Sequence, residues 1–262
     1  MNLFDAIILG LVQGLTEFLP VSSSGHLVIF QDILGMDEPG VTLEILLHFG
    51  TLLSVLWVFG RDFLDLLRFP KDTVQRRFLL LLLVGVIPTA LMAFLLGDHV
   101  ALLFKSTLVV GIMLLVTGGI LKLLTILPAG EKNVSIMGFK DALWVGLLQG
   151  LAVIPGISRS GSTITAALWR GLDRATAVRY SFMLAAPVIF GATLLEARNM
   201  LAMGVDSSLL VNYLVGGLVA FLAGVLAIKT FINLLKQQKF HYFAYYCWAA
   251  GALIIAASIV RG

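Results

Sequence analysis

The sequence predicts an all-α polytopic membrane protein with six transmembrane helices, two re-entrant helix hairpins and an inverted-topology repeat. Three observations lead to this prediction. Apolar residues make up 59% of the 262 residues and charged residues 13%, about half the charged share of an average soluble domain. The stretches 78–97 and 208–228 contain no charged residue, and each is long enough to cross a bilayer as a helix. Segment 5–26 also resembles segment 141–162.

The composition excludes several classes of protein. A chain this apolar is neither a soluble domain nor a disordered one. The single cysteine, Cys247, excludes a disulfide framework and a cysteine-based metal cluster. The net charge of +3 comes from Lys and Arg residues between apolar runs, so we expect membrane topology to explain it and no nucleic acid as partner. We expect no cleavable signal peptide, because the first apolar stretch contains Asp5 and lacks a basic segment before it.

The spans follow from the lengths of the apolar stretches. Two stretches, 3–19 and 141–154, are too short, because about 14–17 residues give a helix of about 21–25 Å against a hydrocarbon core of about 30 Å. Pro20 and Pro155 break them, and serines follow that can cap a second short helix. The order helix, break, helix is typical of a re-entrant hairpin lining a cavity. Six stretches can span the membrane: roughly 43–60, 78–97, 106–127, 180–200, 208–228 and 243–260.

The two short segments are copies of each other. Aligned at an offset of 136, segments 5–26 and 141–162 are identical at ten of 22 positions, including an aspartate, a glutamine and two serines. Shared membrane composition does not explain those polar identities. Three predicted spans separate the copies, and an odd number inverts the second copy relative to the first. We therefore expect one membrane domain, 1–262, with inverted halves 1–127 and 141–262 and a site near the midplane where the broken helices meet.

Positive charge predicts the orientation. The four loops that alternate on one side contain 13 Lys and Arg residues, and the opposite side contains only Lys105, Arg198 and Arg261. The richer side should be the cytoplasm, so both termini and the first hairpin should open to the exterior. The four loops are 61–77, 123–140, 170–179 and 229–240.

Ionisable residues within the apolar segments are candidates for function. Gln13 and Glu17 are four residues apart and share a helix face, with Glu17 at the break. Glu17 could bind a divalent cation, act as a general base or only cap a helix. The run Ser22 to His26 combines hydroxyls with an imidazole at a predicted helix N-terminus. This is the outline of a nucleophile–base pair or an anion site, although serines also serve as simple caps.

The second hairpin contains the most specific segment, Pro155 to Thr163. Ser158 can cap the next helix, and Arg159 has a planar fork that suits phosphate oxygens. With Ser160 and Thr163 nearby, this segment has the composition of a phosphate cradle. An internal ion pair between Arg159 and Glu17 is an alternative, and both could hold.

Other polar or helix-breaking residues in the apolar stretches point less strongly to a function. Glu44 and His48 could support the site or only bond between helices, and Glu196 near a helix end could reach the interface. Pro88 and Pro187 predict helix kinks.

These motifs resemble those of a known family. The run from Gln13 and Glu17 into Pro20–His26, and the run Pro155–Thr163, resemble the two motifs of the bacterial undecaprenyl-diphosphate phosphatases of the bacitracin-resistance type, and the likeness covers essentially the whole chain. The resemblance implies hydrolysis of undecaprenyl diphosphate to the monophosphate, which recycles the lipid carrier for peptidoglycan. It also implies a multi-pass protein of the inner (plasma) membrane, a site open to the periplasm and a divalent cation, Mg²⁺ or Ca²⁺.

The same resemblance assigns roles to residues by position. Glu17 would be the metal ligand or base, with Gln13 beside it, and Ser23 the nucleophile. His26 would be acid/base or a rival nucleophile, and Ser22 would support them. The residues expected to hold the diphosphate are Arg159, Ser158, Ser160 and Thr163.

The sequence departs from the family pattern at two places. Gln13 occupies a position where some members have Glu, and Tyr246–Cys247 stands where we expect Tyr-Arg.

A transporter is the alternative function. Because inverted repeats with broken helices are also typical of transporters, the protein could instead be a transporter or flippase of polyprenyl phosphate or another anion. Expected partners are the polyprenyl diphosphate and membrane lipid, and a homo-oligomer is compatible with the sequence.

Overall fold

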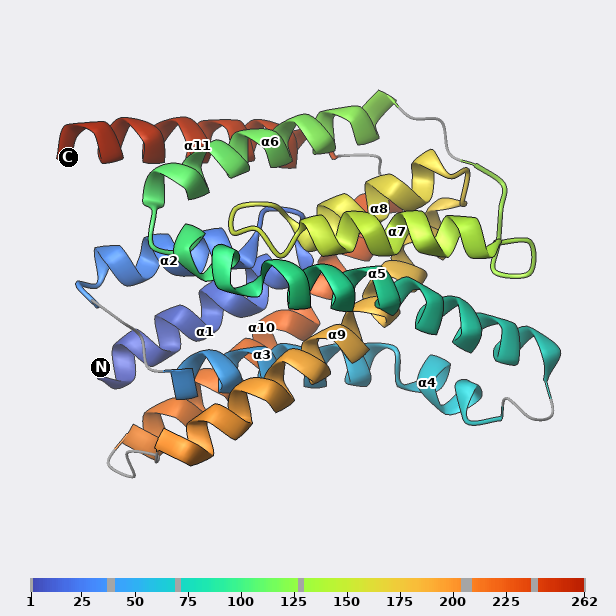
Figure 1. Ribbon diagram of the computed structural model, residues 1–262, viewed down its shortest axis with the longest axis horizontal. Coiled ribbons are helices and arrows are strands. Elements are labelled where there is room, and N and C mark those ends of the chain that lie inside the picture. Colours follow the sequence, from blue (N-terminus) through green and yellow to red (C-terminus); the bar gives the residue numbers. More distant parts are fainter. Residues whose placement is uncertain are drawn as a thin grey trace.

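The computed structural model is all-helical in the part of the chain that it describes, residues 2–36, 41–68, 72–126, 130–203, 209–236 and 240–261. Its one extended contact there is an isolated bridge between Lys132 and Leu172. Figure 1 shows the helices in chain order. They are α1 (Leu3–Phe18), α2 (Ser23–Ile33), α3 (Val41–Val58), α4 (Gly60–Leu66), α5 (Thr73–Leu103), α6 (Thr107–Ile126), α7 (Phe139–Leu151), α8 (Arg159–Trp169), α9 (Arg174–Met203), α10 (Leu210–Lys236) and α11 (His241–Arg261).

Five helices are long and apolar enough to cross a membrane on their own, and a sixth candidate is a bent pair. The five contain the spans Thr73–Gly97, Thr107–Ile126, Arg174–Leu195, Leu210–Leu235 and His241–Val260. The sixth joins α3 and α4 across a bend of 76°, where the sequence predicts one span over 43–60. The chain is thus a polytopic membrane protein.

The described boundaries differ from the predicted ones in detail. Helices α5 and α9 continue through Pro88 and Pro187. Lys71 and Lys239 of the charge count, and the side chain of Glu196, lie outside the described residues.

The two short segments break where the sequence predicts. Ser22 caps α2 by accepting a hydrogen bond from the Gly25 amide at 3.4 Å, and Ser158 caps α8 by accepting one from the Gly161 amide at 3.1 Å. Ser22 has a positive φ of 70°, whereas Ser158 has φ −73°. The predicted caps are therefore confirmed, but only the first requires a backbone conformation that L-residues rarely adopt.

Each short helix packs closely on a long one. Helix α1 lies against α10, and α7 lies against α5. A Cβ added to Gly10 would lie 2.6 Å from the Gly216 carbonyl oxygen, and one added to Gly146 would lie 2.1 Å from the Gly85 oxygen. Such contacts are possible only between residues without side chains, and small residues let membrane helices approach this closely. The long helices also pair with one another: α3 with α10, α5 with α9, α3 with α9, and α6 with α11.

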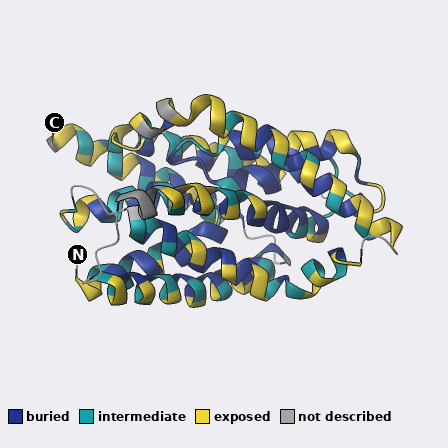
Figure 2. Ribbon diagram, turned by 60° about the horizontal axis from the view of Figure 1, so that its bottom comes forward, coloured by how far each residue is buried: buried dark blue, intermediate teal, exposed yellow. Residues whose placement is uncertain are grey.

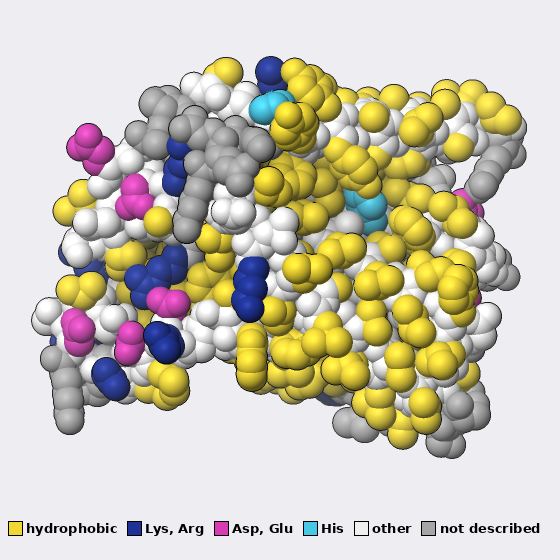
Figure 3. Space-filling model, turned by 180° about the vertical axis from the view of Figure 1, so that it is seen from behind, with side chains coloured by type: hydrophobic (Ala, Val, Ile, Leu, Met, Phe, Trp, Pro, Cys, Tyr) yellow, Lys and Arg dark blue, Asp and Glu magenta, His cyan; other side chains and the backbone are white. Residues whose placement is uncertain are grey.

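A cluster of aromatic residues fills the interior, and apolar side chains cover the outside. Phe182 packs edge-on against Phe18 and Phe59, and Phe231 continues the stack. The outer faces stay apolar: Phe94 is 86% exposed, and exposed residues line the outer faces of the helices in Figure 2. On the face in Figure 3, hydrophobic side chains cover most of the surface and charged ones gather toward one end. This surface suits a lipid solvent.

An ion cluster fixes the start of the second hairpin. Asp141 accepts hydrogen bonds from the Gly138 amide at 3.0 Å and Arg170 Nε at 2.8 Å, and it pairs with Lys132 at 3.2 Å. Burial alone would raise the pKa of the Asp141 carboxyl, but these three donors together hold that pKa below its ordinary value. The corresponding Asp5 is half-buried, and among the described residues its hydrogen bonds are to its own helix N-cap, the exposed Asn2.

Candidate active site

The two helix breaks meet, and an ion pair joins them. Arg159 Nη2, at the start of α8, lies 2.6 Å from Glu17 Oε1, at the end of α1. Both side chains are largely buried, 14% and 6% exposed. The Ser160 hydroxyl also donates to the Leu19 carbonyl at 3.2 Å. Glu17 and Arg159 thus come together from the two halves of the chain, as the alternative ion-pair reading of the sequence predicts.

Glu17 is the centre of the arrangement. Its Oε2 accepts a hydrogen bond from the Ser23 hydroxyl and one from Gln13 Nε2 at 3.1 Å. An ionised carboxylate only accepts hydrogen bonds, so the Ser23 proton must point at Glu17. The group positioned to take a proton from Ser23 is therefore Glu17.

His26 faces different partners. Its Nδ1 lies 2.8 Å from the Ser22 carbonyl oxygen, and its Nε2 lies 2.7 Å from the Tyr246 hydroxyl. Within the described residues it forms no hydrogen bond with Ser23. The structure thus places Ser23 and His26 on the same helix turn but does not couple their functional atoms to each other.

The three hydroxyls of the second motif that are expected to hold the diphosphate are already bonded, whereas the buried Ser162 hydroxyl has no partner among the described residues. Ser158 caps α8, and its amide donates to Thr117 Oγ1 at 3.0 Å. Ser160 bonds across to the first break, and Thr163 Oγ1 donates to the Arg159 carbonyl at 2.9 Å. All three predicted cradle hydroxyls are buried. In this geometry they hold the backbone around Arg159 in shape, and Arg159 remains as the group that can reach a ligand.

Two buried atoms at the centre have no hydrogen-bond partner among the described residues. They are Arg159 Nη1, a cationic donor, and Gln13 Oε1, an amide acceptor. Buried polar groups are usually satisfied, so an unpaired one indicates a bound water, ion or ligand. A phosphate oxygen suits the donor, and a hydrated or metal cation suits the acceptor.

The predicted metal site has few protein ligands. In the described parts of the chain, no three His, Cys, Asp or Glu side chains gather as a metal site. Glu17 and the unpaired Gln13 oxygen offer one carboxylate and one amide, which are hard oxygen ligands of the kind Mg²⁺ and Ca²⁺ prefer. Mg²⁺ commonly takes one or two carboxylates and completes its shell with water and substrate phosphates, so this donor set fits a metal that arrives with a diphosphate.

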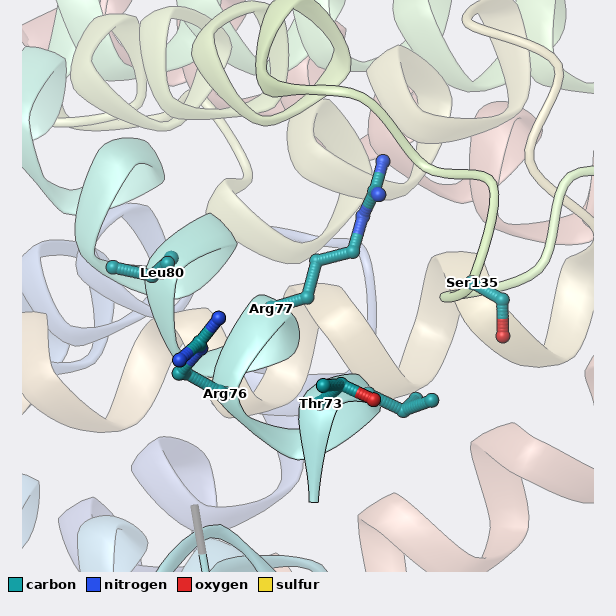
Figure 4. A pocket seen from close by; sticks show the side chains of 6 residues that line it. Thr73, Arg76, Arg77, Leu80 and Ser135 are labelled. Carbon is teal, nitrogen blue, oxygen red and sulfur yellow. The ribbon is translucent and has the colours of Figure 1, made fainter. Parts of the chain in front are cut away.

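A cavity of about 350 Å³ lies elsewhere, at the start of α5. Its lining includes Arg76, Arg77 and Ser135 but none of the predicted site residues. Figure 4 shows the two arginine side chains pointing in different directions, and Arg77 is bonded to the Met137 carbonyl. The candidate active site therefore lies at the helix breaks and not in this cavity.

Sequence reasoning missed two contributors to the site. Tyr246 bonds to His26 across 220 residues, and the Thr117 hydroxyl bonds both to Ser158 N and to the Gly156 carbonyl at 2.8 Å. No local pattern marks either residue; only the departure at Tyr246–Cys247 draws attention to that part of α11. Cys247 is buried, with its sulfur 3.8 Å from the Pro20 carbonyl oxygen.

The sequence leaves open whether Glu44 and His48 support the site or bond between helices. Glu44 bonds from α3 to α2, whereas His48 bonds within α3. Glu44 accepts from Gln31 at 3.3 Å, and His48 Nδ1 lies 2.8 Å from the Glu44 carbonyl.

Comparison with known proteins places the chain. Residues 6–253 match the model of the bacitracin resistance protein BacA family. The undecaprenyl-diphosphatase of Halothermothrix orenii is 48% identical, over 97% of this chain and 98% of its own. The undecaprenyl-diphosphatases of Alkaliphilus metalliredigens and Desulforapulum autotrophicum are 43% and 42% identical, each over 99% of this chain and all of their own. Both motifs meet at one buried ion pair, and the likeness to these proteins covers the full length. The chain therefore belongs to the BacA family.

Proposed function

We propose that this protein hydrolyses undecaprenyl diphosphate to undecaprenyl phosphate and inorganic phosphate, which recycles the carrier for cell-wall synthesis and gives bacitracin resistance. The relatives bear the name of this activity. The observation that carries the proposal is the buried set in which Glu17 accepts from Ser23 and pairs with Arg159. A hydroxyl, an adjacent base and a permanent cation are the groups that phosphoryl transfer needs.

The chemistry follows from these contacts. Ser23 Oγ attacks the terminal phosphorus, its proton passes to Glu17 Oε2, and the bond to the bridging oxygen breaks with its electron pair leaving on undecaprenyl phosphate. Arg159 uses its unpaired Nη1 to bind the phosphoryl oxygens. Glu17 passes the proton from Ser23 to the departing undecaprenyl phosphate and is ionised again. It then takes a proton from the water that attacks the phosphoserine; the bond between phosphorus and Ser23 Oγ breaks with its electron pair on Oγ, Glu17 returns the proton to Oγ, and phosphate is released. Both His26 nitrogens are engaged, which favours Ser23 over His26 as the nucleophile.

A divalent cation, Mg²⁺ or Ca²⁺, is part of the proposal. Glu17 and Gln13 Oε1 would hold it together with phosphate oxygens, and it would supply charge neutralisation at the diphosphate. Gln13 replaces a second carboxylate, so we expect this cation to be bound chiefly in the presence of the substrate.

The finer architecture is also proposed: six spans, two re-entrant hairpins and inverted halves 1–127 and 141–262 within one domain. The packing pattern supports it. The contact of α1 with α10 has its counterpart in the contact of α7 with α5, and α6–α11 and α3–α9 pair corresponding helices of the two halves. The excess of positive charge in the loops assigned to the cytoplasm supports a site open to the periplasm.

One observation keeps the transport alternative in view. The Glu17–Arg159 pair spans the two halves, which is where a transporter places its substrate. A transporter needs no nucleophile, however, and would not release orthophosphate in detergent, where no sealed compartment exists.

The test is orthophosphate release from a C15 or C55 prenyl diphosphate by the purified protein in detergent, with and without EDTA. We expect release to depend on the metal and to fall at least 100-fold, about 2.7 kcal/mol, in Glu17→Gln, Ser23→Ala and Arg159→Ala. Ser24→Ala is the matched control, because among the described residues the Ser24 hydroxyl bonds to the Ser22 hydroxyl at 3.3 Å and not to Glu17 or Arg159. No release by folded wild-type protein would overturn the proposal and favour transport.

A further inference from the structure

We propose that Tyr246 is a positioning residue that fixes the tautomer and orientation of His26 and acts on the reaction through that imidazole. The inference rests on the proposed phosphatase function. It starts from a hydrogen bond of 2.7 Å between Tyr246 Oη and His26 Nε2, which joins the last helix to the first motif.

The partners of the ring assign its protons. A carbonyl oxygen can only accept, so Nδ1, 2.8 Å from the Ser22 carbonyl, must carry a hydrogen. In the neutral ring Nε2 then has the lone pair, and the Tyr246 hydroxyl donates to it. Had Tyr246 been absent, that lone pair would face the interior with no donor in the described contacts, because His26 is only 5% exposed.

A second contact shows that α11 is fixed at this point. The Tyr246 and His26 rings are nearly parallel, 11° apart, with centroids separated by 5.6 Å. The next residue, Cys247, is fully buried against the Pro20 carbonyl of the same break. Adjacent residues of α11 therefore contact the break and the helix that follows it, and the hydroxyl of Tyr246 is held in register with His26.

The hydroxyl suits both charge states of the imidazole. It donates to Nε2 when the ring is neutral, and it can accept from Nε2–H when the ring is protonated. His26 can thus gain or release a proton with only a rotation of the Tyr246 hydroxyl. Because Ser23 already gives its proton to Glu17, His26 is left to serve another proton of the reaction, and Tyr246 keeps it aimed for that purpose.

The kinetic test compares Tyr246→Phe with Tyr245→Phe. Tyr245 is the matched control, because its ring packs on Trp248 and under Lys122, away from His26. We expect Tyr246→Phe to lower kcat about tenfold, the equivalent of one hydrogen bond, with KM changed less than about twofold. Tyr245→Phe should change neither value by more than about twofold.

A double-mutant comparison tests the route of the effect. If Tyr246 acts through His26, adding Tyr246→Phe to His26→Ala should lower the residual rate by less than about twofold. A further tenfold loss in that background, or no loss in the wild-type background, would overturn the proposal.

A chemical readout needs no turnover. Diethyl pyrocarbonate acylates the unprotonated imidazole nitrogen, and mass spectrometry follows His26 with the exposed His99 as internal reference. We expect Tyr246→Phe to free Nε2 and to speed His26 acylation at least about threefold, with no change at His99. An unchanged rate in a variant that melts like wild type would overturn the inference. If wild-type protein released no phosphate, this measurement would still decide whether the pair exists, so the two failures are distinguishable.

Discussion

Hairpin α1–α2 and hairpin α7–α8 begin their second helices with the same set of bonds. In each, a serine caps the helix and its hydroxyl lies 3.3 Å from that of the serine two residues on: Ser22 with Ser24, and Ser158 with Ser160. In each, the first helix approaches a long neighbour through glycine. What the copies share is therefore the means of breaking a helix and packing it against a long neighbour.

The chemistry differs at three aligned positions. Glu17 aligns with Val153, Ser23 with Arg159, and His26 with a serine. Ser23 and Arg159 thus occupy corresponding positions in the two copies, and both contact the same Glu17 carboxylate. One copy thus contributes the acid and the hydroxyl of the candidate site and the other contributes its cation, so neither hairpin contains all of these groups alone.

The largest expected effect comes from weakening the cation of the second hairpin. Arg159→Lys keeps the charge but loses the fork that bonds Glu17 with one nitrogen and offers the other to phosphate. We expect kcat/KM for phosphate release to fall about 30- to 100-fold. Arg170→Lys, at the other end of α8 on Asp141, should stay within about threefold. Equal losses in both variants would mean that Arg159 serves the structure rather than the substrate.

The shared packing predicts parallel losses of stability. Gly10→Ala and Gly146→Ala would each push a methyl group into a carbonyl oxygen of the neighbouring helix. We expect each to lower the free energy of unfolding by about 2–3 kcal/mol in a denaturant titration in mixed micelles. Gly119→Ala is the control, because nothing lies within 4 Å of its added Cβ. A loss at only one of the two glycines would break the structural equivalence of the hairpins.

Local chemistry made much of this predictable from the sequence. Pro20 and Pro155 mark the breaks, the serines after them mark the caps, and charge within an apolar stretch marks Glu17 and Arg159. The repeat even predicts that the two breaks meet, and the ion pair between them is among the expected alternatives.

The remainder depends on how distant helices pack. Tyr246 reaches His26 from the far end of the chain, and no periodicity encodes which turn of α11 faces α2. The bond from Ser23 to Glu17 depends on how sharply the chain turns between the two helices, which the left-handed Ser22 helps to set. The bend between α3 and α4 lies at the end of the predicted span 43–60, and α4 falls in the segment 61–77 that the sequence assigns to a loop.

The two aspartates that start the hairpins predict a pH effect of intermediate size. Asp141 has a pKa in the folded protein that is below its ordinary value of about 3.9. The ionised carboxylate therefore stabilises the fold at pH values above about 3.9, and this stabilisation is lost as the pH falls through the lower pKa of the folded protein. We expect the melting temperature of wild type to fall more steeply below about pH 5 than that of Asp141→Asn. Asp5→Asn, at an exposed cap, should melt with the wild-type slope. If the melting temperatures of wild type and Asp141→Asn fell equally steeply with pH, the ion cluster around Asp141 would not contribute to stability.

The smallest expected difference separates the two caps. A glycine cap costs only a few tenths of a kcal/mol relative to serine, and glycine also relieves a positive φ. Ser22 has φ 70° and Ser158 has φ −73°, so only the first site gains that relief. We expect Ser22→Gly to leave the melting temperature unchanged or to raise it, and Ser158→Gly to lower it by an amount equivalent to about 0.3 kcal/mol. If Ser22→Gly lowered the melting temperature more than Ser158→Gly, the hydroxyl contacts of Ser22 to Gly25 and Ser24 would stabilise the turn by more than its positive φ destabilises it. In that case the first hairpin would depend on serine for its shape as well as for its chemistry.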